Sequence, residues 1–297
     1  MLLRAAAEAA GTQRFHRGAL YVVATPIGNL ADLTLRAIHV LAQVDAVAAE
    51  DTRVAGRLLA HLALARPLIA LHAHNERDAA RSVLARLAAG EAVAYVSDAG
   101  TPAVSDPGAR LVTAVAQAGL RVVPIPGPSA ALAALSAAGD VHGAGFRFAG
   151  FLPAKGAERR AAIEALAAER GTVVLFEAPH RVAGLLDALA AAQPARPLTL
   201  ARELTKQFET VLTLPAAEGP AWLAADAQRL RGEFVLVLHA LAPMPAPDRA
   251  ALDARAERAL AALLPVLPLR QAVALAAEVS GAPRNALYER ALALRAT

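Results

Sequence analysis

Short apolar runs alternate with longer amphipathic stretches along the first part of the chain. The run LYVVA, residues 20–24, is typical of a buried strand, and residues 32–42 carry their apolar side chains at helical spacing. The same alternation predicts further elements: strands 46–49, 68–71, 92–96 and 121–125, and helices 54–62, 76–89 and 107–118. Strands separated by helices of this length are typical of βαβ units, so we expect a largely parallel sheet.

The pattern changes after residue 128. A helix that ends at a glycine cap, Gly139, comes first. We then predict strands and helices in a less regular order: strands 146–150, 172–176, 198–201, 207–214 and 233–239, and helices 157–168, 181–191, 249–264, 269–280 and 284–294. The run 207–214 alternates partly with period two, which favours a mixed sheet with antiparallel character.

These patterns divide the chain into five segments. We predict a flexible tail (1–19), an N-terminal α/β domain (20–128), a second α/β domain (129–240), a proline-rich linker (241–248) and a helical, helix-turn-helix-like extension (249–297). The tail lacks the long apolar core of a secretory signal. No apolar stretch approaches a membrane span without a charge or a proline, so we expect no membrane contact.

The composition indicates the size of the hydrophobic core, the cellular compartment and the possible partners of the protein. Of the 297 residues, 56% are hydrophobic, which is ample for two domains. The absence of cysteine excludes disulfides and thiolate metal sites and fits a reducing compartment, so we expect a cytoplasmic protein. The net charge of +4 rests on arginine, since Lys155 and Lys206 are the two lysines. Arginines gather between Thr52 and Gly90, where they form either a solvated helix face or a surface that follows a phosphate backbone.

Several strand-to-helix loops share one character: small residues, proline and a few polar groups. They are Thr25–Asn29, Ser97–Pro102, Pro126–Ser129 and Glu177–His180. In a wound sheet such loops line one crevice at the carboxyl ends of the strands, so we expect a ligand site there. Gly100 and Ala99 allow close approach of a backbone to the ligand. Ser105 and Asp106 are expected to cap the helix that follows.

Other chemistries have little support. No loop carries a P-loop or a GxGxxG motif, which argues against nucleoside triphosphates and dinucleotides. His72 and His74 form a possible chelating pair, but no third ligand stands at a typical spacing, so no metal is expected. The sequence contains no nucleophile elbow, so it gives no support for an enzyme of acyl transfer.

The same loops carry a family resemblance. In order, the chain contains TPIGNLADLTLRA, AAEDTR, SDAGTPAVSDPG, PIPGPSA, GFLPAKG, FEAPHR, ARELTK and GEFVLVL. This series resembles a family of methyltransferases of small-subunit ribosomal RNA, a branch of the tetrapyrrole (corrin/porphyrin) methylase superfamily. The similarity runs from about Leu20 to the C-terminus.

The resemblance implies two α/β domains of the tetrapyrrole methylase type, with S-adenosylmethionine bound in the cleft between them, and a small C-terminal helical domain. It also implies a homodimer that methylates the ribose 2′-oxygen of a cytidine in the decoding region of 16S rRNA, within the small ribosomal subunit. The implied cofactor-binding residues are Pro26, Asp98, Ala99, Gly100, Thr101, Val104, Ser129, Ala130, Glu177, Gly232 and Glu233. Asp98 either meets the cationic part of the cofactor or braces its loop.

A 2′-hydroxyl is a weak acid, so its methylation calls for a general base. Residue type and location leave four candidates, which the sequence does not rank: Glu50, Asp51, His74 and Glu177. If the basic side chains hold RNA phosphate, the residues expected to do so are Arg53, Arg57, Arg77, Arg81, Lys155 and Lys206. The C-terminal helices either grip RNA or brace a dimer or a domain.

Two other functions remain open at this point. A methyltransferase of a small tetrapyrrole would account for the cofactor loops but not for the helical extension or the arginine-rich segment. A non-catalytic RNA-binding assembly factor would keep the fold without the reaction.

Overall fold

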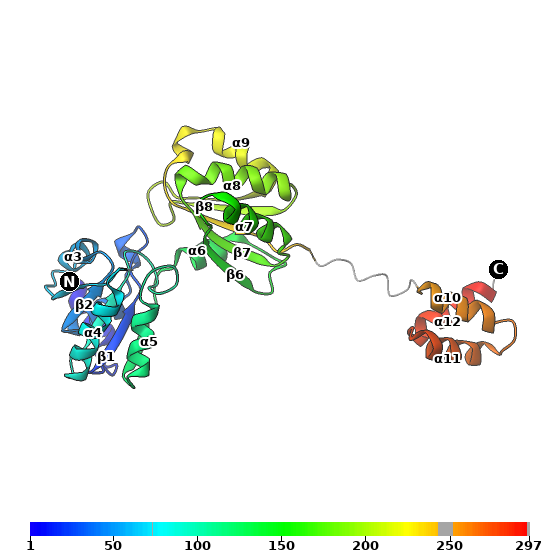
Figure 1. The fold of residues 1–297 in the computed structure, drawn as a ribbon, viewed down its shortest axis with the longest axis horizontal. Coiled ribbons are helices and arrows are strands. Elements are labelled where there is room, and N and C mark those ends of the chain that lie inside the picture. Colours follow the sequence, from blue (N-terminus) through cyan, green and yellow to red (C-terminus); the bar gives the residue numbers. More distant parts are fainter. Residues whose placement is uncertain (73, 243–251, 296–297) are drawn as a thin grey trace. The chain divides into compact units, whose positions relative to one another are not determined.

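The computed structural model describes residues 1–72, 74–242 and 252–295. The chain divides into two compact units, residues 1–241 and 242–297 (Figure 1). The predicted linker, 241–248, lies outside the described residues from 243 onward. Within the described part, no helix is both long and apolar enough to cross a membrane.

The first sheet has five parallel strands. They are β1 (Ala19–Val23), β2 (Ala46–Ala49), β3 (Leu68–Ala70), β4 (Val93–Val96) and β5 (Arg121–Ile125). Their order across the sheet is β3-β2-β4-β1-β5. The parallel sheet predicted from alternating strands and helices is thus confirmed.

Helices cover both faces of this sheet. They are α2 (Leu35–Gln43) and α3 (Thr52–His61) on one face, and α4 (Glu76–Ala88) and α5 (Ala109–Gln117) on the other, with a 3-10 turn, η1 (Leu30–Asp32), before α2. Side chains alternate between the two cores because successive residues of a strand point to opposite faces. Tyr21 packs in the core under α2 and α3, whereas Leu20 packs under α4 and α5.

The N-terminal segment differs from the flexible tail that we expected. Residues Leu2–Ala10 form a helix, α1, which packs against α2. Leu3, Ala6 and Ala10 recur at helical spacing, and both alanines are buried. The small side chains let this helix lie close to its neighbour, so part of the predicted tail belongs to the first domain.

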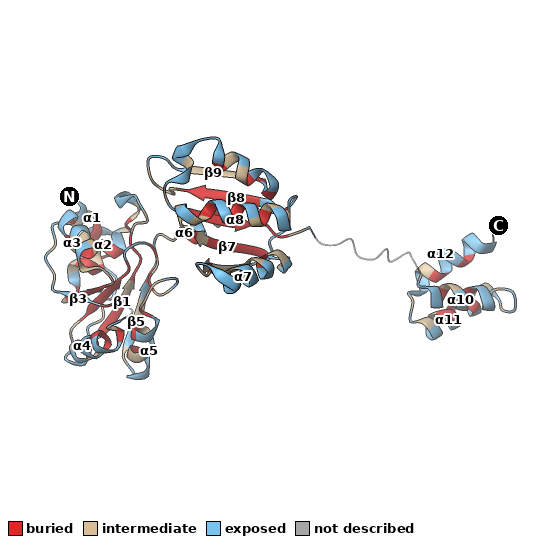
Figure 2. Ribbon diagram, turned by 45° about the horizontal axis from the view of Figure 1, so that its top comes forward, coloured by how far each residue is buried: buried red, intermediate tan, exposed pale blue. Residues whose placement is uncertain are grey.

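The second sheet is mixed, as the irregular order of its elements predicts. Its strands are β6 (Phe146–Phe151), β7 (Thr172–Glu177), β8 (Pro197–Arg202), β9 (Thr210–Pro215) and β10 (Phe234–Leu238). They lie in the order β6-β7-β10-β8-β9, and the β6–β7 pair is parallel while the other pairs are antiparallel. Figure 2 shows β7 and β8 buried behind helices whose outer faces are exposed.

The helices of the second domain also lie on both faces. One face carries α7 (Gly156–Ala168), α8 (Pro179–Ala192), η2 (Ala216–Glu218) and α9 (Gly219–Ala224), while α6 (Ala130–Ala138) covers the other and η3 (Ala227–Leu230) precedes β10. Gly139 caps α6 in the left-handed conformation, as predicted.

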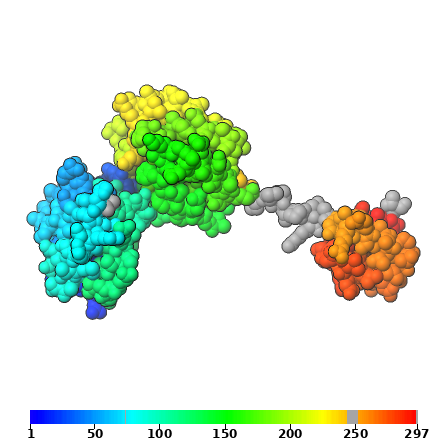
Figure 3. Space-filling model, in the orientation of Figure 1, coloured from blue at the N-terminus to red at the C-terminus, as the bar shows by residue number. Residues whose placement is uncertain are grey.

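The C-terminal unit is a three-helix body with its own core. Its helices are α10 (Ala254–Leu263), α11 (Leu269–Ser280) and α12 (Arg284–Arg295). Leu260, Val273 and Leu287 meet in its buried centre. Figure 3 shows these helices, in orange and red, packed into one compact body.

Candidate functional site

A cavity of about 480 Å³ lies in the first unit, where loops of its two sheets meet. Most residues predicted to bind a cofactor line it: Asp98, Ala99, Gly100, Thr101, Val104, Ser129, Ala130, Glu177 and Glu233. Pro26 lines a second cavity instead, and Gly232 is absent from both linings. The prediction that these loops share one crevice therefore agrees with the geometry for most of its residues.

The strand order explains why the cavity forms here. The helices after β1 and β2 lie on one face of the first sheet, whereas α5, after β4, lies on the other face. Since β4 lies between β1 and β2, the chain leaves neighbouring strand ends in opposite directions and opens a crevice beyond them. Ile27, Glu50 and Asp98 follow these three strands, and all line the cavity.

Backbone bonds hold the loop after β4 in place. Gly100 and Thr25 exchange two hydrogen bonds, with N–O distances of 2.9 and 3.0 Å. The hydroxyl of Thr101 donates to the carbonyl of Pro128 at 3.0 Å and ties this loop to the one after β5. Gly100 has φ +80°, a conformation that side chains with a Cβ rarely adopt, so glycine is required for this tight turn.

Ser105 and Asp106 do not cap α5, contrary to our expectation. The helix begins after Gly108, and the carboxylate of buried Glu76 accepts hydrogen bonds from Gly108 N–H at 3.0 Å and Arg110 N–H at 3.3 Å. Glu76 belongs to α4, so the cap comes from a neighbouring helix. Asp106 instead faces the cavity.

One end of the cavity is acidic. Glu50, Asp98 and Asp106 all line it. Burial raises the pKa of the Glu50 carboxyl above its ordinary value of 4.5, and the negative charges of Asp98 and Asp106 raise it further. Burial likewise raises the pKa of Asp106. The Glu50 and Asp106 carboxyls therefore hold protons more tightly than exposed carboxyls do.

Asp51 serves the local fold. Its carboxylate caps α3 and pairs with the Arg53 side chain, with an Nε–Oδ1 distance of 3.0 Å. Hydrogen bonds from Arg53 lower the pKa of Asp51 to about 2. The Asp51 N–H donates to the Asp98 carboxylate at 3.0 Å. Asp98 therefore braces the loops and lines the cavity at once.

At the other end, Glu177 is fully buried between two guanidinium groups. Its carboxylate lies 2.9 Å from Arg159 Nη2 and 2.9 Å from Arg181 Nε, and it accepts a hydrogen bond from Ala178 N–H. Both arginines also donate to the backbone after β6, at Pro153. Glu177 thus joins β7, α7 and α8. The sequence did not single out either arginine.

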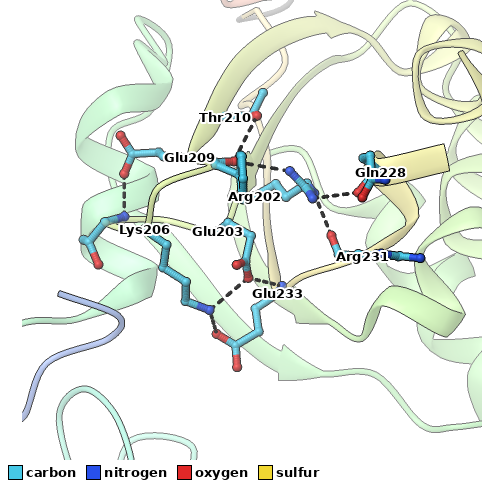
Figure 4. Close-up of polar contacts among 10 residues, drawn as sticks. Arg202, Glu203, Lys206, Glu209, Thr210, Gln228, Arg231 and Glu233 are labelled. Atoms are coloured by element: carbon cyan, nitrogen blue, oxygen red, sulfur yellow. Dashed lines mark hydrogen bonds and ion pairs between the residues drawn. The ribbon is translucent and has the colours of Figure 1, made fainter. Parts of the chain in front are cut away.

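Lys206 also has carboxylate partners. Figure 4 shows its ammonium group between Glu203 and Glu233, at 2.9 Å from each. Burial acts to raise the pKa of Glu203, but hydrogen bonds from Lys206 and the Glu233 N–H outweigh burial and lower it. Gly232 lies against Glu203, since a Cβ at Gly232 would come within 2.4 Å of Glu203 Cγ. Gly232 therefore contacts the glutamate that pairs with Lys206 and does not line the main cavity.

A buried arginine supports the same loop. Arg202 donates to the carbonyls of Arg231 at 2.6 Å and Gln228 at 2.7 Å, as Figure 4 shows. These bonds fix the turn that leads into β10. Glu203, next in the chain, takes φ +51°, which is uncommon for a residue with a Cβ.

The remaining predicted residues lie on the surface. His74 is exposed beside His72, with 6.1 Å between ring centroids. Among the described residues, no group of three or more His, Asp or Glu side chains could hold a metal ion. Arg81 pairs with Asp78 at 2.5 Å, and Lys155 is exposed at the start of α7.

Comparison with known proteins identifies the family. A model of the tetrapyrrole (corrin/porphyrin) methylases matches residues 19–219, and a model of the RsmI C-terminal HTH domain matches residues 250–295. The chain belongs to the tetrapyrrole methylase family. Membership makes it a methyltransferase, and it accounts for the loops that surround the cavity.

Relatives within the family are close. Ribosomal RNA small subunit methyltransferase I of Pseudomonas aeruginosa is 49% identical over 280 residues, which cover 93% of this chain and 97% of that protein. The Escherichia coli O157:H7 protein of the same name is 48% identical over 277 residues, covering 93% and 95%. A solved structure of uroporphyrin-III C-methyltransferase from Thermus thermophilus, complexed with S-adenyl homocysteine, shares the fold. Its TM-score is 0.53 at 19% identity, covering 74% of this chain and 97% of that one.

Proposed function

We propose that this tetrapyrrole methylase transfers a methyl group from S-adenosylmethionine to the ribose 2′-oxygen of a cytidine in the decoding region of 16S rRNA, within the small ribosomal subunit. We place the reaction in the cytoplasm and assign it to a homodimer. The names of the close relatives support the RNA substrate. The resemblance of the loop motifs supports the finer assignment to a cytidine 2′-oxygen.

The cavity suits this cofactor chemically. S-adenosylmethionine carries a sulfonium and an ammonium group, and Glu50, Asp98 and Asp106 supply negative charge at one end of the cavity. Phe151 and Phe176 supply apolar surface for an adenine ring. The small-residue loop Ala99–Thr101 leaves its backbone open to close contact. The cavity lining therefore offers negative charge for the cationic groups of the cofactor and apolar surface for its adenine ring.

The first turn of α6 offers donors for a carboxylate. Ser129 and Ala130 line the cavity at the start of this nine-residue helix. The first N–H groups of a helix have no partner within it and carry partial positive charge. We assign the amino-acid carboxylate of the cofactor to this end.

The four candidate bases are no longer equivalent. Asp51 is held ionised by Arg53, Glu177 forms ion pairs with two arginines, and His74 is exposed and outside the cavity lining. Glu50 lines the cavity with a raised pKa, the property expected of a general base. The bound cofactor supplies an activated methyl group. Glu50 would accept the hydroxyl proton as the 2′-oxygen takes the methyl group, the methyl–sulfur bond breaks and the neutral thioether leaves.

One observation carries the proposal most: a proton-accepting carboxylate and the cofactor loops face the same cavity. The test is to incubate the protein with methyl-labelled S-adenosylmethionine and either undermethylated small ribosomal subunits or uroporphyrinogen III. Label in the 2′-O position of one 16S cytidine supports the proposal. Label in the tetrapyrrole favours a small-molecule enzyme, and binding to subunits without label favours an assembly factor.

A further inference from the structure

A second cavity lies on the other side of the loop that follows β1. It has a volume of about 250 Å³. Pro26 and Gly28 face this cavity, whereas Ile27 between them faces the first. Asp98 lines both. The two cavities are therefore neighbours that share a wall, and the Thr25–Gly100 hydrogen bonds hold that wall in place.

The second cavity combines apolar and basic surface. Val54 and Leu58, one helical turn apart on α3, form an apolar side. Arg57 and His61, also one turn apart, add two basic groups from the same helix. An apolar wall beside a guanidinium group fits a base or ribose next to a phosphate. The volume lies just below that of sites for drug-sized ligands, so it suits a single nucleotide unit.

Arg57 differs from its neighbours in charge pairing. Arg53 pairs with Asp51, and Arg81 pairs with Asp78. Among the described residues, no carboxylate forms an ion pair with the exposed Arg57. Its charge is thus available to an anionic ligand. Of the two arginines on α3 predicted to meet RNA, Arg57 is the one that also lines a cavity.

We propose that the second cavity holds one unstacked nucleotide of the substrate RNA, next to the nucleotide that is methylated. This inference rests on the proposed function. Methyl transfer requires the reacting atoms to lie about 3–3.5 Å apart, so the target ribose must share the first cavity with the methyl donor. A flanking nucleotide then falls beyond the wall, where Arg57 meets its phosphate and Val54 and Leu58 meet its apolar surface.

The test compares three variants on small ribosomal subunits purified from cells that lack this methylase. Arg57→Gln removes the proposed phosphate contact, and Val54→Phe fills the apolar side without changing charge. Arg160→Gln is the matched control, since Arg160 is an exposed arginine on α7 outside both cavities and was not predicted to meet RNA. The measurements are KM for subunits, kcat, affinity for S-adenosylmethionine by calorimetry, and thermal unfolding.

We expect Arg57→Gln to raise KM roughly tenfold, in keeping with the loss of one charged hydrogen bond. It should also flatten the salt dependence of binding by about 0.7–0.9 log units per tenfold change in salt. Val54→Phe should raise KM without changing that slope. Both variants should keep cofactor affinity and kcat, and Arg160→Gln should keep every value.

Three results would overturn the inference. One is a wild-type KM in both cavity variants while the wild-type enzyme methylates subunits normally. Another is an equal rise in KM for Arg57→Gln and Arg160→Gln, which would indicate diffuse electrostatic attraction. The third is weaker binding to subunits with unchanged binding to protein-free 16S rRNA, which would make a ribosomal protein the occupant. Failure of the wild-type enzyme to methylate subunits would instead remove the proposed function itself.

Discussion

Two glutamates that line the main cavity, one at a strand end of each sheet, lie in opposite surroundings. Glu50 is half-buried, and burial together with the neighbouring carboxylates raises its pKa. Glu177 is fully buried but lies between two guanidinium groups. A carboxylate with unfavourable neighbours binds a proton readily, whereas one with matched cations holds structural elements together. We propose that Glu50 takes part in the chemistry, whereas Glu177 joins β7, α7 and α8.

Glu50→Gln should give the largest effect on the rate of methyl transfer, and it tests the proposed role of Glu50 as the base. General bases contribute about 10²–10⁴-fold to a rate, so we expect a loss of that size in single-turnover methyl transfer. Cofactor affinity, measured by calorimetry, should change little because Asp98 and Asp106 keep the end of the cavity acidic. A Glu50→Gln enzyme with a near-normal rate would remove Glu50 from the reaction.

The same variant should not lose stability. The folded-state pKa of Glu50 lies above the ordinary 4.5, so the native state binds the proton more tightly than the unfolded chain does. Stability therefore falls as pH rises from about 4.5 through the folded-state pKa. Glutamine is neutral throughout, so Glu50→Gln should unfold at the same or a higher temperature than wild type at neutral pH.

Glu177→Gln should lower the stability of the fold much more than the rate of methyl transfer. It leaves Arg159 and Arg181, largely buried, without their shared counter-charge. Breaking a buried pair by removing one partner costs about 3–5 kcal/mol, and chemical denaturation of the first unit measures this. Any fraction that stays folded should keep a measurable methyl-transfer rate. A stable but inactive Glu177→Gln protein would indicate that Glu177, like Glu50, takes part in the reaction.

Gly100→Ala should give a smaller effect, restricted to the cofactor. A Cβ at Gly100 would lie 3.4 Å from Ile27 Cγ2, at the close limit of ordinary contact, on a side chain that lines the cavity. Overpacking costs about 1–3 kcal/mol, so we expect cofactor affinity to fall about tenfold. Gly90→Ala is the matched control, since Gly90 also has positive φ, at +85°, but nothing within 4 Å. Equal loss of affinity in both variants would indicate general strain instead.

Local sequence patterns predict much of the fold. The strands and most helices follow from apolar periodicity, and the loops that line the main cavity follow from small residues at strand ends. Helix α1 was not predicted because its buried side chains, Ala6 and Ala10, are weakly hydrophobic. Small residues bury well against a neighbouring helix, but that neighbour is not visible in a local pattern.

Partners far apart in the sequence could not be predicted from it. Glu76 caps a helix that begins more than thirty residues later, at Gly108. Lys206 meets Glu233 through the pairing of β8 with β10. The sequence ranked Glu50 and Glu177 equally because each stands at the end of a strand. Their difference comes from charges that the tertiary structure brings near them.

The pH dependence of a single methyl-transfer turnover tests most directly whether Glu50 accepts the proton. A base acts only in its deprotonated form. Because burial and neighbouring carboxylates raise the pKa of Glu50, the wild-type rate should climb with pH along a limb whose midpoint lies above 4.5. Glu50→Gln should show a low rate without this limb. The same limb at a wild-type rate in Glu50→Gln would contradict the assignment.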